Sequence, residues 1–549
     1  MGQAPSRKVP PPNAMIVAPQ PEAVSAGADI LRAGGSALDA VMACAMVQGV
    51  VDPLMCGIGG FGMLHIYDPA TGTRRVYEGF GGCPIASRAD MWQDIVLGET
   101  IDGFGFIVKD FINEAGVQSI TAPGILKALS AAHAEFGSMP WSDLFGAAIR
   151  CAREGWIVRP HVYTVFTQNE RKYGRMNYGE KLALTPDGRR IYLEPDGSYK
   201  KLGTYIQNPD LAATLETLAK EGADSFYTGS LAAHIIDDVH RNNGLLSTED
   251  LAQFRLRTAD PLSVNYRGWR VDMPAPPGGG VLVGQILRIA EQFDLPTLGH
   301  NSPDYIRVLA EAMKIALRDK EQFIGDPDYA DNPVDRLLSD AYCSEQATRI
   351  RAGEKADVVR RTPGESKHTT HVSAIDANGM IVSLTHTLGN PSGFIVKDSG
   401  FMMNGAMSTF DPTPGTPNSI APGKRRYSSM CPSIIYAGEQ PVFTLGAPGA
   451  SWIGPAVAQV ILNVLEWGMG VQEAIIAPRI VATSNAIDIS NRIPHSVQQA
   501  VEQLGYDVRR SYLSYAFAGV HGITCFDGKI EGGADPQRDG YAEGVSGSA

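Results

Sequence analysis

The chain is 549 residues long, with 44% hydrophobic and 19% charged residues, a composition typical of a soluble globular enzyme with a substantial core. Its formal net charge of −12 argues against nucleic acid or an anionic membrane surface as a partner, because both are bound through basic patches. The seven cysteines are odd in number and include no C-x-x-C pair, so we expect reduced thiols rather than a disulfide framework.

The first residues, 1–14, are rich in proline and contain no apolar run long enough for a signal peptide, so they predict a flexible tail. No later stretch approaches the roughly 18 consecutive apolar residues that cross a bilayer. Together with the reduced cysteines, these features lead us to expect a cytoplasmic protein that has no membrane partner.

The first two-thirds of the chain predicts a strand followed mainly by helices. Apolar residues at helical spacing, with Gly or Pro near the ends, occupy six segments: 21–35, 37–51, 123–156, 209–255, 281–293 and 303–323. The glycines of 57–62 predict a tight turn into an alternating strand rather than a dinucleotide-binding fingerprint, because no helix opens after them.

The polar region 329–368 is poorly periodic and predicts a mobile or exposed segment. After it the pattern changes to alternating strands around the turn Asn378-Gly379 and over 425–449, followed by helices at 453–466 and 495–504. Helices therefore flank strands along the whole chain, and the natural fold class is a layered helix–sheet–sheet–helix sandwich.

The segment H-T-T-H-V-S-A-I-D at 368–376 carries the chemistry. A threonine hydroxyl needs a nearby base, and the α-amine of a chain that begins with threonine can serve, with an unperturbed pKa of about 7.7. Thr369 lacks that amine unless the His368–Thr369 bond is cut, which its own hydroxyl can do by attacking the preceding carbonyl. Taken alone, a Thr-Thr pair at the start of a strand more often reflects plain β-propensity.

The surroundings of this segment decide between the two interpretations. Ordered blocks occur along nearly the whole chain, among them MCGIGGFG, TTHVSAIDANG, PGKRRYSSMCPSII and LGAPGASWI. Together they resemble the γ-glutamyltransferase family of N-terminal nucleophile hydrolases. The resemblance implies an α+β fold, a four-layer αββα sandwich. It also implies a precursor that cuts itself into a large subunit, 15–368, and a small subunit, 369–549, which stay associated.

The resemblance assigns catalytic roles residue by residue. Thr369 matches the nucleophile and new N-terminus, and Thr387 matches the second threonine that supports it. Gly449 and Ala450 stand where the family has a Gly-Gly pair whose backbone amides form the oxyanion hole, and backbone donors do not depend on the side chain. The substrate-side serine pair matches Ser428 and Ser429.

In this chain, most of the residues with which the family binds the α-amino acid end of its substrate are replaced. The arginine for the α-carboxylate aligns with Phe80, an asparagine with Gly389, a glutamine with Ala406, and the aspartate for the ammonium with Thr409. Loss of a buried bidentate arginine removes roughly 2–5 kcal/mol of binding. We therefore expect Phe80 and Tyr427 to line a more apolar or flatter acyl pocket, with Gly389 and Thr409 also at the substrate, and glutathione to be a poor substrate.

These observations favour a self-cleaving amidohydrolase that acts on a small amide through a threonine acyl-enzyme. The expected acyl group has no free α-amino acid head, as in the oxamate-amidohydrolase-like and cephalosporin-acylase-like branches. One alternative is a true γ-glutamyl hydrolase or transferase that uses other residues, such as Arg425 or Arg426; another is an uncleaved, non-catalytic binding protein. The histidine pattern predicts no metal site, we expect no cofactor, and the sequence leaves open whether the cleaved heterodimer forms a homodimer.

Overall fold

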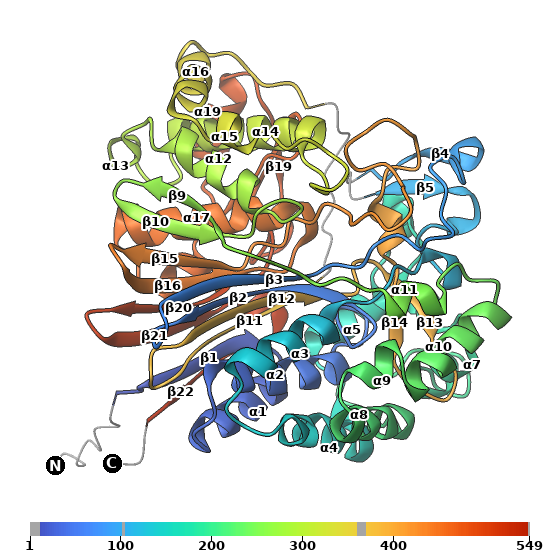
Figure 1. Ribbon diagram of the computed structural model, residues 1–549. Helices are drawn as coiled ribbons and strands as arrows, with labels where there is room; N and C mark the ends of the chain where they lie inside the picture. The colour runs from blue at the N-terminus through green and yellow to red at the C-terminus, as the bar shows by residue number, and fades with distance from the viewer. Residues whose placement is uncertain (1–10, 102–104, 359–368, 547–549) are drawn as a thin grey trace.

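The fold is a sandwich of two antiparallel sheets between two layers of helices (Figure 1). A computed structural model describes residues 11–101, 105–358 and 369–546 of the chain. The seven-stranded sheet has the order β22 (Gly540–Val545), β1 (Ala14–Pro19), β11 (Thr370–Ile375), β12 (Ile381–Thr387), β2 (Phe61–Asp68), β3 (Thr73–Gly79) and β8 (Arg257–Ala259). The six-stranded sheet has the order β21 (Lys529–Ala534), β20 (His521–Phe526), β16 (Gln440–Gly446), β15 (Ser433–Ala437), β10 (Trp269–Met273) and β9 (Leu262–Tyr266).

The two sheets pack face to face through alternating apolar side chains. Strands expose alternate residues to opposite faces, and the inward-facing set forms one buried cluster: Met15, Val17, Ile375, Ile381, Ile434, Tyr436, Ile523 and Ala534. Both central strands, β11 and β12, are buried on the helix-facing side as well. Toward the helices the two strands carry mainly apolar side chains, whereas toward the other sheet each has one isoleucine beside buried polar residues, such as Ser373 and Ser383.

Each outer face of the sandwich is covered by helices (Figure 1). One layer comprises α1 (Pro21–Arg32), α2 (Ala37–Val51) and α3 (Ile125–Phe136), and the other α12 (Gly280–Ala290), α14 (Pro303–Phe323), α17 (Ile453–Trp467) and α18 (Val471–Ile476). Nearly every residue of α2 is buried, which explains its continuous apolar sequence. The helix begins with a capping box between Ser36 and Asp39.

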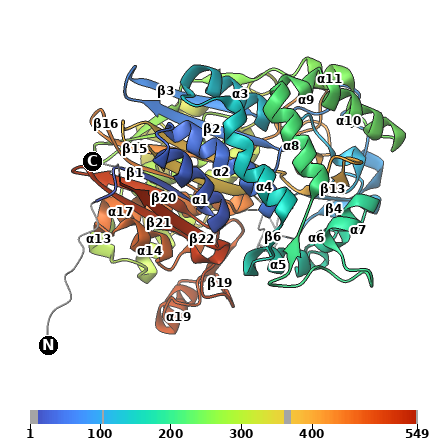
Figure 2. The ribbon, with the colours of Figure 1, turned by 90° about the horizontal axis from the view of Figure 1, so that it is seen from below.

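Further helices gather at one end of the sandwich, beyond α3 (Figures 1 and 2). They are α4 (Gly146–Glu154), α5 (Pro160–Thr167), α6 (Tyr178–Leu182), α7 (Pro186–Tyr192), α8 (Pro209–Glu221), α9 (Asp224–Tyr227), α10 (Ser230–Arg241) and α11 (Thr248–Ala252). The remaining helices are α13 (Leu295–Leu298), α15 (Val334–Leu337), α16 (Asp340–Arg351) and α19 (His495–Gln503). The smaller sheets are β4 (Val96–Glu99) with β5 (Phe106–Val108), β6 (Trp156–Ile157) with β7 (Tyr205–Ile206), β13 (Pro391–Ile395) with β14 (Met402–Asn404), and β17 (Ile480–Val481) with β18 (Ala486–Ile489) and β19 (Asp507–Arg510).

The layered αββα fold expected from the sequence is confirmed. Residues 329–358, expected to be exposed or mobile, are mostly exposed or half-buried, but they also form two helices that were not predicted, α15 and α16, and Cys343, Ala347 and Ile350 of α16 are buried. The buried residues of α16 stand at helical spacing, but they include a glutamine and small side chains, so the apolar signal in the sequence is weak. Residues 359–368 lie outside the described residues. No helix in the described ranges is long and apolar enough to span a membrane.

Candidate active site

The two threonines singled out by the sequence meet at the end of the β11–β12 pair. Thr370 pairs with His386 across these strands, so the preceding residue, Thr369, lies opposite Thr387. The Thr369 hydroxyl donates to Thr387 Oγ1 over 3.1 Å, and Thr387 Oγ1 also accepts the backbone N–H of Gly389 over 2.8 Å. The Gly389 N–H thus holds the Thr387 hydroxyl in place, and Thr387 Oγ1 in turn holds the hydroxyl of Thr369.

The backbone at Thr369 is strained. Its φ is +88°, a left-handed value that is unfavourable for a β-branched residue and costs on the order of 1–3 kcal/mol. The angle φ is defined across the bond to residue 368, so cutting that bond removes the constraint. Strain at this point therefore favours cleavage immediately before Thr369.

A buried glutamine of α2 ties both strands together behind this pair. Gln48 Nε2 donates to Thr370 Oγ1 over 3.0 Å, and Gln48 Oε1 lies 2.9 Å from Nε2 of His386. Burial lowers the pKa of His386 to about 3, so the imidazole is neutral and donates to Gln48. This contact was not predicted from the sequence, where its only trace is one glutamine within the apolar run of α2 that follows Asp39.

His371 has a packing role on the opposite face of β11. Its Nδ1 lies 2.8 Å from Thr385 Oγ1 and its Nε2 lies 2.9 Å from Ser373 Oγ. Burial lowers its pKa to about 3, and the ring packs so closely on Gly446 that a Cβ there would lie 2.3 Å from it. Among the described residues, no group of three or more His, Cys, Asp or Glu side chains could hold a metal ion.

The predicted oxyanion-hole residues form the turn that starts α17. Gly449 and Ala450 have φ values of +141° and +51°, and Ala450 opens a short 3₁₀ helix, Ala450–Trp452, that runs into α17. Within the described parts of the chain, neither backbone N–H of this pair donates to a protein acceptor. Two unused amides beside a helix start suit a developing negative charge.

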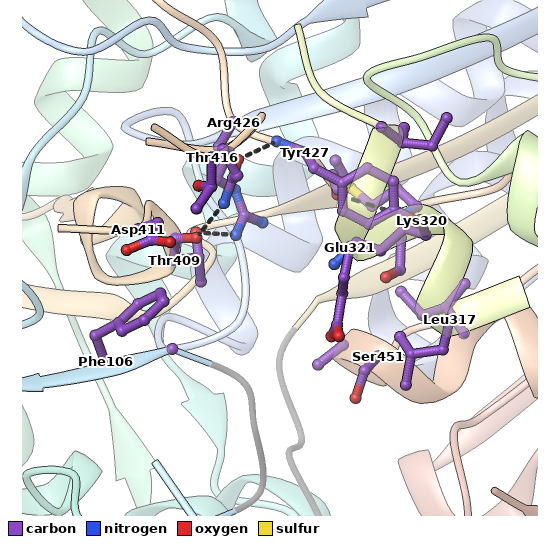
Figure 3. Close-up of a pocket in the computed structure, with 18 of the residues that line it drawn as sticks. Phe106, Leu317, Lys320, Glu321, Thr409, Asp411, Thr416, Arg426, Tyr427 and Ser451 are labelled. Carbon is purple, nitrogen blue, oxygen red and sulfur yellow. Dashed lines mark hydrogen bonds between the residues drawn. The ribbon is translucent and has the colours of Figure 1, made fainter. Parts of the chain in front are cut away.

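A cavity of about 300 Å³ opens beside these groups. Its wall includes Thr369, Ala450, Ser428 and Ser429, so the structure brings together most of the predicted catalytic and binding residues. Thr409 and Tyr427 line the same cavity, on opposite sides of Arg426 in Figure 3. The segment 425–432 enters this wall as irregular backbone, and the strand expected there begins only at Ser433.

Two residues predicted to bind substrate do not line this cavity. Phe80 is 1% exposed and packs on Phe61 with ring centroids 5.9 Å apart. Gly389 has a φ of +72°, and a Cβ at this position would lie 3.0 Å from Cζ of Phe61. Both positions therefore belong to the packed layer around Phe61, and their contact with substrate stays a prediction.

The two adjacent arginines have different environments. Arg425 binds Asp326 through Nε and Nη2, at 3.0 and 2.6 Å, and reaches Asp328 with Nη2. Arg426 instead donates from Nη1 to Thr409 Oγ1, and its guanidinium lies 5.0 Å from the centroid of the Phe61 ring. Burial lowers the pKa of Arg426 to about 10, so it stays charged at neutral pH.

Comparisons with known proteins agree with this geometry. The family model described as "Gamma-glutamyltranspeptidase" matches residues 23–545. The chain belongs to this family. It is 35% identical over 540 residues to "Acylase ACY 1 proenzyme" of Pseudomonas sp. (strain SE83), covering 97% of this chain and 94% of that protein. It is 31% identical over 489 residues to "Glutathione hydrolase proenzyme" of Escherichia coli (strain K12), covering 85% and 80%.

A solved structure extends the likeness to three dimensions. The cephalosporin acylase from Bacillus halodurans matches with a TM-score of 0.86 at 26% identity, covering 100% of both chains. The chain is therefore an N-terminal nucleophile amide hydrolase or acyltransferase of this family, made as a precursor that cleaves itself. The assignment of individual site residues stays a prediction, and His368, on the other side of the expected cut, lies outside the described residues.

Proposed function

We propose that the enzyme hydrolyses an amide whose acyl group carries no α-ammonium, with Thr369 as nucleophile. In self-cleavage the Thr369 hydroxyl attacks the carbonyl of residue 368, and the acyl group moves from nitrogen to oxygen. Water then opens this ester, which leaves a carboxylate on residue 368 and a free α-amine on Thr369. The positive φ at Thr369 supports this step.

Turnover uses the same hydroxyl with the new amine as base. The hydroxyl proton passes to the amine as Thr369 Oγ1 attacks the substrate carbonyl, while Thr387 Oγ1 keeps the nucleophile oriented. The amides of Gly449 and Ala450 are the candidates to bind the oxyanion. The ammonium returns the proton to the leaving amine, and water hydrolyses the threonine ester to release the acid.

One observation carries the choice of acyl group. Thr409 stands where relatives that bind a glutamyl head have an aspartate, and its hydroxyl oxygen is bound to the guanidinium of Arg426. An α-ammonium at this point would meet a fixed positive charge instead of a carboxylate. At an effective dielectric constant of about 20 and a separation of about 4 Å, the repulsion is on the order of 4 kcal/mol.

A second candidate function, γ-glutamyl hydrolysis or transfer, is favoured by a different residue. Asp411 lies two residues beyond Thr409 and also lines the cavity. Its carboxylate accepts the Thr413 N–H over 2.8 Å and is the group that an incoming ammonium would use.

Paired anilides separate the two functions. Glutaryl and γ-glutamyl 4-nitroanilide differ only by the α-ammonium, so the ratio of their kcat/KM values reports its effect alone. We expect the glutaryl compound to be favoured by about 10²-fold or more, since an unpaired buried charge costs several kcal/mol. A γ-glutamyl compound that is hydrolysed equally well or better would assign the second function. A denaturing gel that shows a single uncleaved chain would assign the non-catalytic alternative.

The cellular compartment is part of this proposal. All seven cysteines of the chain are free thiols, and five of them are buried, which suits a reducing cytoplasm. Persistence of all seven free thiols in protein isolated under non-reducing conditions would support this placement.

A further inference from the structure

Arg426 is a buried cation without a carboxylate partner among the described residues. Its side chain is part of a residue only 6% exposed, and its Nε has no hydrogen-bond partner in the described structure. The contacts that it makes are a neutral hydroxyl, Thr409 Oγ1, and the face of Phe61. Taking a charge out of water costs several kcal/mol unless a partner compensates for it. Burial of the Arg426 guanidinium without an anionic partner is therefore unfavourable and calls for a functional explanation.

The neighbouring arginine shows what a purely structural arginine looks like here. Arg425 has two carboxylates, on Asp326 and Asp328, and lies outside the cavity wall. Arg426 follows it directly in the chain but turns to the wall of the cavity that also contains Thr369. Figure 3 shows the guanidinium of Arg426 between Thr409 and Tyr427 at this wall. The missing anionic partner of Arg426 therefore has a space to occupy, and that space adjoins the nucleophile.

The acids of the cavity do not supply this partner. Glu99 and Glu321 are exposed at its rim. Asp411 is half-buried and accepts the Thr413 N–H, and the described residues contain no ion pair within 4.0 Å between it and Arg426. A second cation, Lys320, lies over the ring of Tyr427 at 4.3 Å on the same wall. Arg426 therefore remains the buried cation of this cavity that is open to an incoming anion.

We propose, building on the proposed function, that Arg426 binds a carboxylate at the far end of the acyl group, so that the substrate is a monoamide of a dicarboxylic acid. Its scissile carbonyl lies at Thr369 and its free carboxylate at the guanidinium, which forms charge-assisted hydrogen bonds of the kind arginine makes with carboxylates. Ser428 Oγ accepts the Met430 N–H over 3.3 Å, so its hydroxyl proton is available to the same carboxylate. The chain thereby keeps an arginine for an acidic substrate, but on a different segment from Phe80.

Matched pairs of anilides test this assignment. Oxalyl, succinyl and glutaryl 4-nitroanilide are compared with acetyl, butanoyl and pentanoyl 4-nitroanilide, which have the same carbon count and no carboxylate. In the self-cleaved wild-type enzyme we expect at least one pair to favour the carboxylate on the order of 10²-fold in kcat/KM. The favoured pair also reports the length of the acyl group. Ratios near one in all three pairs would overturn the proposal.

Variants locate the effect at Arg426. Arg426→Gln should reduce the preferred ratio to about the uncharged level, and Arg426→Lys should retain part of it because the charge remains. Arg241→Gln is the matched control, since Arg241 is an exposed arginine of α10 that pairs only with Asp237 in the described structure. It should leave the ratio at the wild-type value. An unchanged ratio in Arg426→Gln would place the carboxylate elsewhere and overturn the assignment.

Two further readouts keep the test decisive. If Arg426→Gln fails to cleave itself, calorimetric titration with glutarate replaces turnover: binding at least about 10-fold weaker than to wild type supports the proposal, and equal binding refutes it. The γ-glutamyl compound separates failure of the two proposals. Strong γ-glutamyl hydrolysis that still depends on Arg426 contradicts the proposed function alone, whereas discrimination against γ-glutamyl with no carboxylate preference contradicts the role of Arg426 alone.

Discussion

Replacement of Thr387 by valine tests how the nucleophile is held. Valine keeps the branched shape of a side chain that is fully enclosed at the end of β12, and removes only the oxygen. That oxygen accepts the Thr369 hydroxyl over 3.1 Å and the Gly389 N–H over 2.8 Å. The loss of a net hydrogen bond costs about 1 kcal/mol, and a buried N–H left unsatisfied costs about 1–3 kcal/mol.

The cost should appear in both reactions of the same hydroxyl. If about 1.4–2.7 kcal/mol of the lost hydrogen-bond energy had stabilised the transition state, self-cleavage and turnover should each slow by about 10- to 100-fold. Every 1.36 kcal/mol corresponds to about a factor of ten in rate. Self-cleavage is followed on denaturing gels after a pulse of synthesis, and turnover from the anilide once cleavage is complete. Thr387→Ser restores the oxygen and should recover most of both rates. A valine variant that cleaves and turns over as fast as the serine variant would refute the positioning role of Thr387.

The remaining predictions concern the charge at the acyl site and a buried carboxyl. Thr409→Asp places an acceptor for ammonium beside Arg426 and should raise the ratio of γ-glutamyl to glutaryl hydrolysis by about 10-fold or more, which kcat/KM for the two anilides measures; an unchanged ratio would contradict it. Burial raises the pKa of Asp488 to about 7, so the folded state binds more protons than the unfolded state above the unfolded carboxyl pKa of about 3.9. Stability from this group is therefore present below that value and is lost as pH rises to about 7. Asp488→Asn should raise Tm at pH 8 and have little effect on it at pH 4, with thermal denaturation at both pH values as the measurement.

The fold was predictable because its periodicities are long and consistent. The helical segments at 21–35, 37–51 and 303–323 reappear as α1, α2 and α14, and the Asn378-Gly379 turn joins β11 to β12. The helix α16 was not predicted for a physical reason: its buried face is only weakly apolar, so its packing partners rather than its sequence pattern decide the helix.

The site was predictable only where the chemistry lies within a motif. The relation of Thr369 to Thr387 follows from two strands joined by a short turn, so eighteen residues in sequence become 3.1 Å in space. The burial of Phe80 and the close approach of Gly389 to Phe61 were not predictable, because a motif gives a position in the chain and not the burial of the side chain. The distinction between Arg425 and Arg426 depends on Asp326 and Asp328, about 100 residues earlier, and no local pattern contains it.

The burial of Phe80 also affects how the family's carboxylate-binding arginine, which this chain lacks at that position, could be restored. An arginine at position 80 would place its guanidinium near Phe61 in the core, where the guanidinium of Arg426 already lies 5.0 Å from the centroid of that ring. Substitution at Thr409 alone, on the cavity wall, is therefore the sharper probe of the acyl site.

The N-terminal sequence of the smaller fragment tests the central claim most directly. We predict that purified wild-type protein contains two associated fragments and that the smaller one begins at Thr369. Thr369→Ala should remain one chain of 58.8 kDa without activity, because one hydroxyl performs both attacks, and Thr369→Ser should still cleave because it keeps a hydroxyl. A smaller fragment that begins at another residue, or normal cleavage of Thr369→Ala, would contradict the account.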